Sequence, residues 1–178
     1  MKPKLLLHIC CAGCGAHISE TLKSDYQVAL YFYNPNIFPE DEYNKRLEEA
    51  KKIADEFWLD LIIGGYGHKG WLKEINGLEK EPEKGKRCYV CYKLRIEETA
   101  KIAKAKDYDF FSTTLTISPH KDAGAISAIG RELARKHNID FLDKDFKKQE
   151  GFKKSCELSR KLGLYRQNYC GCEFSVRK

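Results

Sequence analysis

Apolar and polar residues recur along the chain with two different periods, and this pattern predicts an α/β fold. Short, continuous apolar runs have the length and composition of strands that are buried on both faces of a parallel sheet. Longer segments with an apolar residue every three or four positions predict amphipathic helices between those strands. The predicted strands cover residues 4–9, 26–34, 59–65, 108–115 and 139–142.

The predicted helices follow the strands in regular alternation, except between the third and fourth strands. The clearest helix covers residues 39–58, where Leu47, Ala50 and Ala54 share one face. Ser118 and Pro119 are predicted to be the N-cap and first residue of a helix that runs to about His137. The other predicted helices cover residues 13–24, 71–75, 88–105 and 151–162.

This alternation predicts a single doubly wound, mostly parallel sheet of five strands with helices on both faces. The common orders of such sheets favour strand order 3-2-1-4-5, a PP-loop-like arrangement. The first and fourth strands would then be neighbours at the switch point, where ligands bind beyond the carboxyl ends of the strands. We therefore expect the turn after residue 9 and the loop over residues 113–120 to share one crevice.

The 178 residues fit a single α/β domain over residues 1–178. It would carry a helical insertion at about residues 66–107 and a cysteine-bearing tail at about 163–178. We see no signal-peptide pattern, and no apolar run approaches the roughly 20 residues of a membrane helix. A cytoplasmic protein with no membrane partner is expected. The net charge of +6 suits a polyanionic partner, but a lysine-rich solvated surface explains it equally well.

Seven of the eight cysteines fall into three groups, and only Cys156 stands alone. Clustered thiols in a cytoplasmic chain are more often metal ligands or redox groups than structural bridges. Cys156 lies within the last predicted helix, where a buried and inert thiol is expected. The three groups are Cys10, Cys11 and Cys14, then Cys88 and Cys91, then Cys170 and Cys172.

The thiol groups leave three kinds of chemistry open. Cys88 and Cys91 open a predicted helix beside Lys86 and Arg87, a setting that favours the thiolate, which is the form that binds metal. An iron–sulfur cube, a zinc site with four thiolates and a dithiol redox site all fit this pattern. The Cys-Gly-Cys sequence at residues 170–172 could close into a strained disulfide or chelate a second metal.

Polar and aromatic residues near the crevice are candidates for binding a substrate. Hydroxyls at the end of the fourth strand could hold phosphate or sugar oxygens, and aromatic and basic residues alternate beside the last cysteines. Stacking on an unpaired base and ordinary packing of the tail both explain that second pattern. His8, inside a buried strand, is expected to be a hydrogen-bonded core residue. The candidates are Thr113, Thr114, Ser118, His120, Tyr165, Arg166 and Tyr169.

Taken together, five segments resemble the cobalamin-independent epoxyqueuosine reductases, and the similarity spans nearly the whole chain. They are HICCAGC at 8–14, RCYVCYKLR at 87–95, TTLTISP at 113–119, DFK at 145–147 and LYRQNYCGC at 164–172. Two positions depart from that family's pattern, which often has proline in place of Gly13 and arginine in place of Lys147. The second departure weakens bidentate anion recognition there, because lysine offers only a point charge.

The resemblance implies an oxidoreductase that reduces the epoxide of epoxyqueuosine at the wobble position of tRNA. It implies a 4Fe–4S cluster, an anticodon loop as partner, and an external electron donor. By this resemblance the cluster ligands are Cys10, Cys11, Cys88 and Cys91, while Cys170 and Cys172 form a redox pair or bind a second metal. A possible second, mononuclear iron would add Cys14 as a ligand. The base would stack on Tyr92, Tyr165 or Tyr169.

Two rival functions remain at this point. The first is an RNA-binding module stabilised by zinc and without redox activity. The second follows from the sheet topology, which is shared with ATP-using tRNA thiolation enzymes. The first turn of this chain lacks their glycine- and serine-rich loop and has Cys10 and Cys11 in its place.

Overall fold

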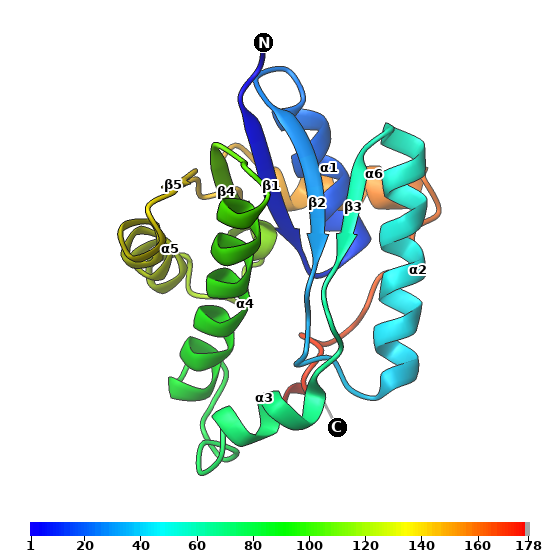
Figure 1. Ribbon diagram of the computed structural model, residues 1–178. Helices are drawn as coiled ribbons and strands as arrows, with labels where there is room; N and C mark the ends of the chain where they lie inside the picture. The colour runs from blue at the N-terminus through cyan, green and yellow to red at the C-terminus, as the bar shows by residue number, and fades with distance from the viewer. Residues whose placement is uncertain (177–178) are drawn as a thin grey trace.

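The computed structural model describes residues 1–176, which form a five-stranded sheet with helices packed on both of its faces (Figure 1). All four strand pairs are parallel, and the order is β3-β2-β1-β4-β5. The predicted fold class and strand order are therefore confirmed. The strands are β1 (Lys4–Ile9), β2 (Gln27–Phe32), β3 (Asp60–Ile63), β4 (Phe110–Thr113) and β5 (Asp140–Phe141).

Six α-helices and two short 3-10 helices connect and extend this sheet within residues 1–176. Two of the α-helices, α3 and α4, lie between β3 and β4, where the sequence predicted an insertion. Residues 177–178 of the predicted tail lie outside the described part of the chain. The helices are α1 (Ala12–Leu22), α2 (Glu40–Phe57), α3 (His68–Glu74), α4 (Lys86–Ala105), η1 (Thr114–Ile117), α5 (Ala123–His137), α6 (Gly151–Lys161) and η2 (Glu173–Ser175).

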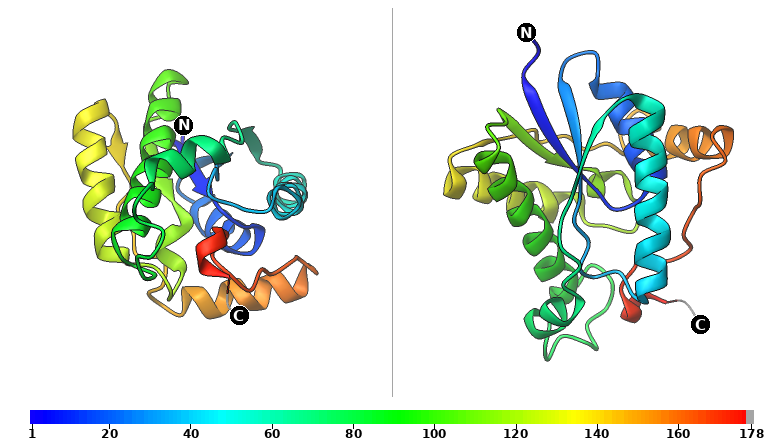
Figure 2. Two further views of the ribbon diagram at one scale, coloured as in Figure 1. Left: turned by 90° about the horizontal axis from the view of Figure 1, so that it is seen from below. Right: turned by 45° about the vertical axis from the view of Figure 1, so that its right-hand side comes forward.

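Alternate side chains of the central strands enter two separate apolar layers. Leu5 and Leu7 of β1 pack with residues of α1 and α2, whereas Leu6 packs with residues of α4 and α5. Figure 2 shows these two groups of helices on opposite sides of the sheet. Because β1 and β2 are covered on both faces, their apolar residues run almost without interruption.

The start of α5 differs from the prediction. The helix begins at Ala123, and its N-cap is Asp122, whose side chain accepts a hydrogen bond from the amide of Ala125 at 3.0 Å. The cap predicted at Ser118 and Pro119 is therefore wrong. The short η1 turn occupies residues 114–117, directly before this segment. Ser118 does not cap α5, and its Oγ accepts a hydrogen bond from the amide of His120 at 3.2 Å. Residues 118–121 consequently form a loop at the edge of the sheet.

The register of the sheet determines where the site can form. His8 of β1 lies opposite Thr113 of β4, so the two strands deliver their following residues to the same edge. Cys10 and Cys11 follow β1 immediately, and α1 starts directly after them. None of the helices within residues 1–176 combines the length and apolarity needed to cross a membrane.

Candidate active site

A cavity of about 260 Å³ lies beyond the carboxyl ends of β1 and β4. Its walls come from the turn after β1, the start of α4, the loop after η1, one face of α6 and the C-terminal tail. The structure thus brings members of all three cysteine groups to one place. The cysteines that line it are Cys10, Cys11, Cys14, Cys88, Cys156, Cys170 and Cys172.

Cys91 is the cysteine that does not line the cavity. It is buried and packs with Cys172, Trp71 and Ile75 in a small apolar cluster. All eight cysteines are free thiols. Among residues 1–176, no three His, Cys, Asp or Glu side chains converge closely enough to hold one metal ion as they stand.

The thiols are less acidic than the sequence led us to expect. Burial raises the pKa of Cys91 to about 11. The pKa of Cys10 lies well above its usual value, first because of its hydrogen bond with Cys11 and then because of burial. For Cys11 the bond with Cys10 lowers the pKa, but the bond with Cys14 and burial outweigh it and raise the pKa to about 11. For Cys91 the prediction that the start of α4 favours the thiolate is wrong in the metal-free chain, because burial outweighs the helix end.

Two buried cations lie among the cysteines. Arg95 of α4 is 1 % exposed, and Lys121 in the loop before α5 is 9 % exposed. Neither forms an ion pair within the described residues, and Nη2 of Arg95 has no hydrogen-bond partner there. Burial alone would lower the pKa of both groups, but attraction to the surrounding sulfurs in their thiolate form, Cys170 and Cys10 among them, outweighs it and raises both values. The cavity is therefore suited to negative charge on its thiols.

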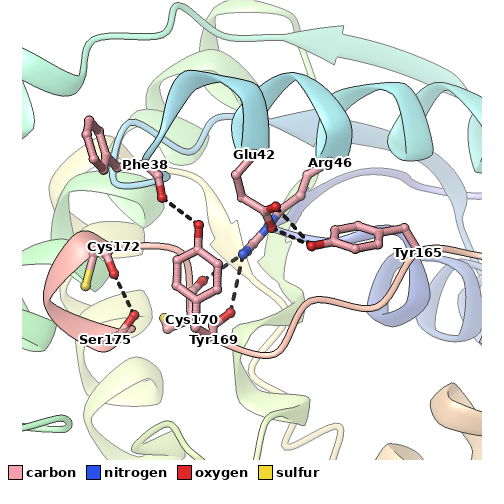
Figure 3. A network of polar contacts seen from close by, with 8 residues as sticks. All are labelled: Phe38, Glu42, Arg46, Tyr165, Tyr169, Cys170, Cys172 and Ser175. Atoms are coloured by element: carbon pink, nitrogen blue, oxygen red, sulfur yellow. Dashed lines mark hydrogen bonds and ion pairs between the residues drawn. The ribbon is translucent and has the colours of Figure 1, made fainter. Parts of the chain in front are cut away.

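Arg46 of α2 fixes the position of the C-terminal tail (Figure 3). Its guanidinium is buried and donates from Nη1 to the carbonyl of Cys170 at 3.0 Å and from Nη2 to that of Tyr169 at 3.3 Å. Nε donates to Glu42 at 2.7 Å, and Tyr165 donates its hydroxyl to the same carboxylate at 3.0 Å. One buried ion pair thus holds the tail at three points.

Gly171 is required where the tail reaches α2. Its φ of +130° is a conformation that side chains disfavour, and a Cβ there would lie 3.0 Å from Ile37 and 3.2 Å from Arg46. Its carbonyl accepts a hydrogen bond from the amide of Phe38 at 2.9 Å. The glycine of the Cys-Gly-Cys sequence therefore lets both cysteines reach the cavity while the backbone lies against α2.

The structure places most of the predicted substrate-binding residues at the cavity. Thr113 is the exception, because its hydroxyl lies between Nδ1 of His8, at 2.9 Å, and the amide of Leu115, at 3.2 Å. Burial lowers the pKa of His8 to about 3, so this histidine is neutral. The residues that line the cavity are Tyr92, Thr114, Ser118, His120, Tyr165, Arg166 and Tyr169.

These lining residues differ in how free they are to meet a ligand. Oγ1 of Thr114 is buried and has no partner within residues 1–176. Tyr165 is bonded to Glu42 of α2, and Tyr169 donates its hydroxyl to the carbonyl of Phe38 at 2.5 Å. Both tyrosines thus fasten the tail, and Thr114 is the better candidate for a direct polar contact.

Sequence reasoning missed several residues of the site. Cys156 was expected to be buried and inert, and the expected burial is wrong. It is half-buried, lines the cavity and accepts a hydrogen bond from Nη2 of Arg166 at 3.0 Å. Phe152, one helical turn earlier, lines the same wall. Their spacing of four residues was the available signal, since it places them on one face of α6.

The sheet order and the thiol-lined cavity define a PP-loop-like α/β protein with a candidate metal or redox site. Solved structures of this class include the U34-tRNA thiolase NcsA from Methanococcus maripaludis with its [4Fe-4S] cluster. That match has a TM-score of 0.62 and 14% identity, and covers 99% of this chain and 63% of that one. A predicted subunit of tRNA methyltransferase from Methanocaldococcus jannaschii matches with a TM-score of 0.57 and 15% identity, covering 88% of this chain and 74% of that one. At these identities both show the fold alone.

The family is shown by sequence. A family model described as epoxyqueuosine reductase QueH matches residues 5–178. The relative of that name in Haemophilus influenzae is 38% identical, over 98% of this chain and 72% of its own length. The relative in Thermotoga maritima is 37% identical, over 97% of this chain and 90% of its own length. The chain therefore belongs to the epoxyqueuosine reductase QueH family, and it is an oxidoreductase, as the resemblance implied.

Proposed function

We propose that this chain reduces epoxyqueuosine in tRNA to queuosine. The reaction removes the epoxide oxygen as water and forms a carbon–carbon double bond, which consumes two electrons and two protons. Family membership over residues 5–178 supports this assignment. The observation that carries it to a site is the gathering of seven cysteines around one cavity beside two buried cations.

Cys10, Cys11 and Cys88 line the cavity, and Cys91 lies one helical turn after Cys88 in α4, so these four cysteines would hold a 4Fe–4S cluster. In such a cluster each cysteine binds a different iron, so the sulfurs surround the group and need not converge on one ion. Arg95 and Lys121 would balance the negative charge of the thiolates, and the free Nη2 of Arg95 is available as a donor. When bound, the cluster supplies electrons one at a time.

We assign a second redox group, which would complete the two-electron reduction, to Cys170 and Cys172, and their position in the cavity wall supports this assignment. As a dithiol, the pair would release two electrons and two protons on forming a disulfide, which matches the demand of the epoxide. Alternatively, the pair would bind a second iron together with Cys14. An external electron donor restores the reduced state in either case.

The walls of the cavity offer contacts for the modified nucleoside. An anticodon loop is single-stranded, so one base can leave the stack and enter a protein cavity. The unpartnered hydroxyl of Thr114, with Ser118 and His120 on the same wall, would bind its polar groups. Tyr92 and Arg166 would contact its ring system.

Anaerobic purification with metal and sulfide analysis, followed by electron paramagnetic resonance of the reduced protein, tests the cofactor. We expect a brown protein that bleaches with dithionite and converts epoxyqueuosine in tRNA with loss of one oxygen atom, as measured by mass spectrometry. A colourless protein that holds only zinc after anaerobic reconstitution would contradict the proposal and favour the zinc-stabilised RNA-binding module.

Single substitutions separate the roles of the cysteines. We expect Cys88→Ser to prevent cluster assembly, and Cys172→Ser to keep the iron and the colour but to lose turnover. Cys156→Ser is the matched control, since it removes a cavity thiol with no proposed role and should preserve both properties. Full activity in Cys172→Ser would show that the terminal pair is not the second redox group.

A further inference from the structure

Phe152 stands at the cavity in an unusual environment. It belongs to the first turn of α6, lines the cavity and is 39 % exposed. It is not part of any of the three apolar clusters. Within residues 1–176 its ring stacks on no other aromatic ring. The side chain therefore contributes little to the core and presents an apolar ring to whatever enters the cavity.

The other large exposed apolar side chains of residues 1–176 do not share this position. Phe38, also exposed, stacks on His68 with ring centroids 5.1 Å apart. Trp58 is 93 % exposed at the end of α2, away from the cavity walls. Phe152 is the one exposed large apolar residue in this part of the chain that lines the cavity.

The segment that carries Phe152 is strongly basic. Residues 144–161 contain seven lysines and arginines against three acidic residues, a net charge of +4 within a chain whose total is +6. Lys153 pairs with Glu150 at 3.3 Å. Lys148 and Lys154 are exposed and have no carboxylate partner among the described residues. Exposed aromatic rings and basic side chains carried on one segment are features of proteins that bind single-stranded nucleic acid.

We infer that Phe152 is a stacking platform for an unpaired base of the RNA substrate, adjacent to the base that enters the cavity, with the basic charge of residues 144–161 attracting the phosphates of the loop. This inference rests on the proposed function, because it takes the anticodon loop as the ligand. Stacking on an aromatic ring tolerates any base, so Phe152 would hold the loop in place without reading its sequence.

The test measures binding of an anticodon stem-loop RNA to the metal-loaded full chain and to its variants by fluorescence anisotropy. We expect Phe152→Ala to weaken binding by about 5- to 150-fold, the range that corresponds to the loss of one stacked base. Phe152→Trp should bind at least as tightly as the wild type. Trp58→Ala, which removes an exposed aromatic ring outside the cavity, should leave binding unchanged. Equal thermal unfolding midpoints would show that the variants are folded.

A second readout locates the stacked base. The fluorescent base 2-aminopurine, placed in turn at the two nucleotides that flank the modified position, should be quenched at one of them by the wild type and not by Phe152→Ala. Wild-type affinity in Phe152→Ala, or no quenching at either nucleotide, would overturn the inference and leave the proposed reductase intact. Failure of the wild type to bind the stem-loop would overturn both.

Discussion

Arg95 and Lys121 give the cavity its electrostatic character. They are buried among cysteines with no carboxylate partner among residues 1–176, and the pKa values of the neighbouring Cys10 and Cys91 thiols are raised above their usual value. Thiolates must replace thiols when metal binds, so assembly of the site releases protons to solvent. The thiolates then place negative charge beside the two cations.

The raised thiol pKa values predict how the stability of the metal-free chain depends on pH. Cys11 and Cys91 have a pKa of about 11 when folded, against a usual value near 9.0 when unfolded. Between these values the folded state binds more protons, so the free energy of unfolding falls as the pH rises. Each thiol should contribute a loss on the order of 2–3 kcal/mol by about pH 11.

Urea unfolding of the reduced, metal-free chain at about pH 8 and about pH 10.5 measures this loss. Cys91→Ala is the appropriate comparison, since it removes one of the two thiols and should make the pH dependence shallower. An identical pH dependence in wild type and variant would show that Cys91 does not titrate as described.

At the scale of elements, α1 and α6 approach each other closely at Gly13. A Cβ there would lie 2.2 Å from Oγ of Ser159, while Ser155 donates to the carbonyl of Gly13 at 3.0 Å. A proline at this position would place its Cβ against the same hydroxyl. The turn that carries Cys10, Cys11 and Cys14 thus packs closely against Ser155 and Ser159 of α6.

This contact predicts a destabilised Gly13→Ala variant. Alanine normally stabilises a helix relative to glycine, but here we expect a loss of about 1–3 kcal/mol from overpacking. Ser159→Ala should relieve it in the double variant, because the nearest remaining atom, the Cβ of residue 159, lies 3.4 Å away. A double-mutant cycle of unfolding free energies measures the coupling, and simple additivity would contradict the proposed clash.

The link between α2 and the tail predicts a second effect at this scale. Arg46→Met leaves Glu42, which is 11% exposed, without its partner and frees the carbonyls of Tyr169 and Cys170. We expect a loss of about 3–5 kcal/mol, with faster hydrogen exchange over residues 169–175. Arg46→Lys should be intermediate, because a point charge cannot replace the three-way guanidinium contact.

The control for Arg46 lies on the same helix. Lys51 pairs with Glu48 on the surface, and Lys51→Met should change stability by less than about 0.5 kcal/mol. If Arg46→Met leaves the hydrogen exchange of the tail unchanged, the tail is held by its other contacts.

At the scale of the whole molecule, the sheet was predictable because the strands are buried on both faces. The uninterrupted apolar residues of β1 and β2 indicated parallel strands, and the switch-point rule then placed Cys10 beside the loop after β4. Strand order and the shared crevice of the turn after β1 and the loop after β4 both follow from this reasoning.

The contacts that complete the site were not predictable in the same way. Arg46 lies in a highly charged helix, where its pattern is that of a solvated residue, yet it bonds to a carbonyl 124 positions away. The burial of Lys121 depends on the η1 turn and on the late start of α5, neither of which has a periodic signal. Tertiary contacts determine the conformation of irregular segments, and the spacing of apolar residues along the sequence does not reveal such contacts.

The whole molecule should remain folded without metal. Its two main apolar clusters lie on the faces of the sheet and are formed largely by residues away from the cavity. We expect a chelator to leave the far-ultraviolet circular dichroism spectrum and cooperative thermal unfolding in place, while the iron is lost. Complete unfolding on chelation would instead indicate a metal-dependent fold, as the zinc-stabilised module requires.

The walls of the cavity come from opposite ends of the described chain, and this determines when the site can exist during synthesis. At about 5–20 residues per second, the roughly 160 residues between Cys11 and Cys172 take on the order of 10–30 s to translate. For that length of time the first cysteines exist without the tail that encloses them. Every molecule therefore passes through a period in which its earliest thiols depend on the reducing capacity of their surroundings.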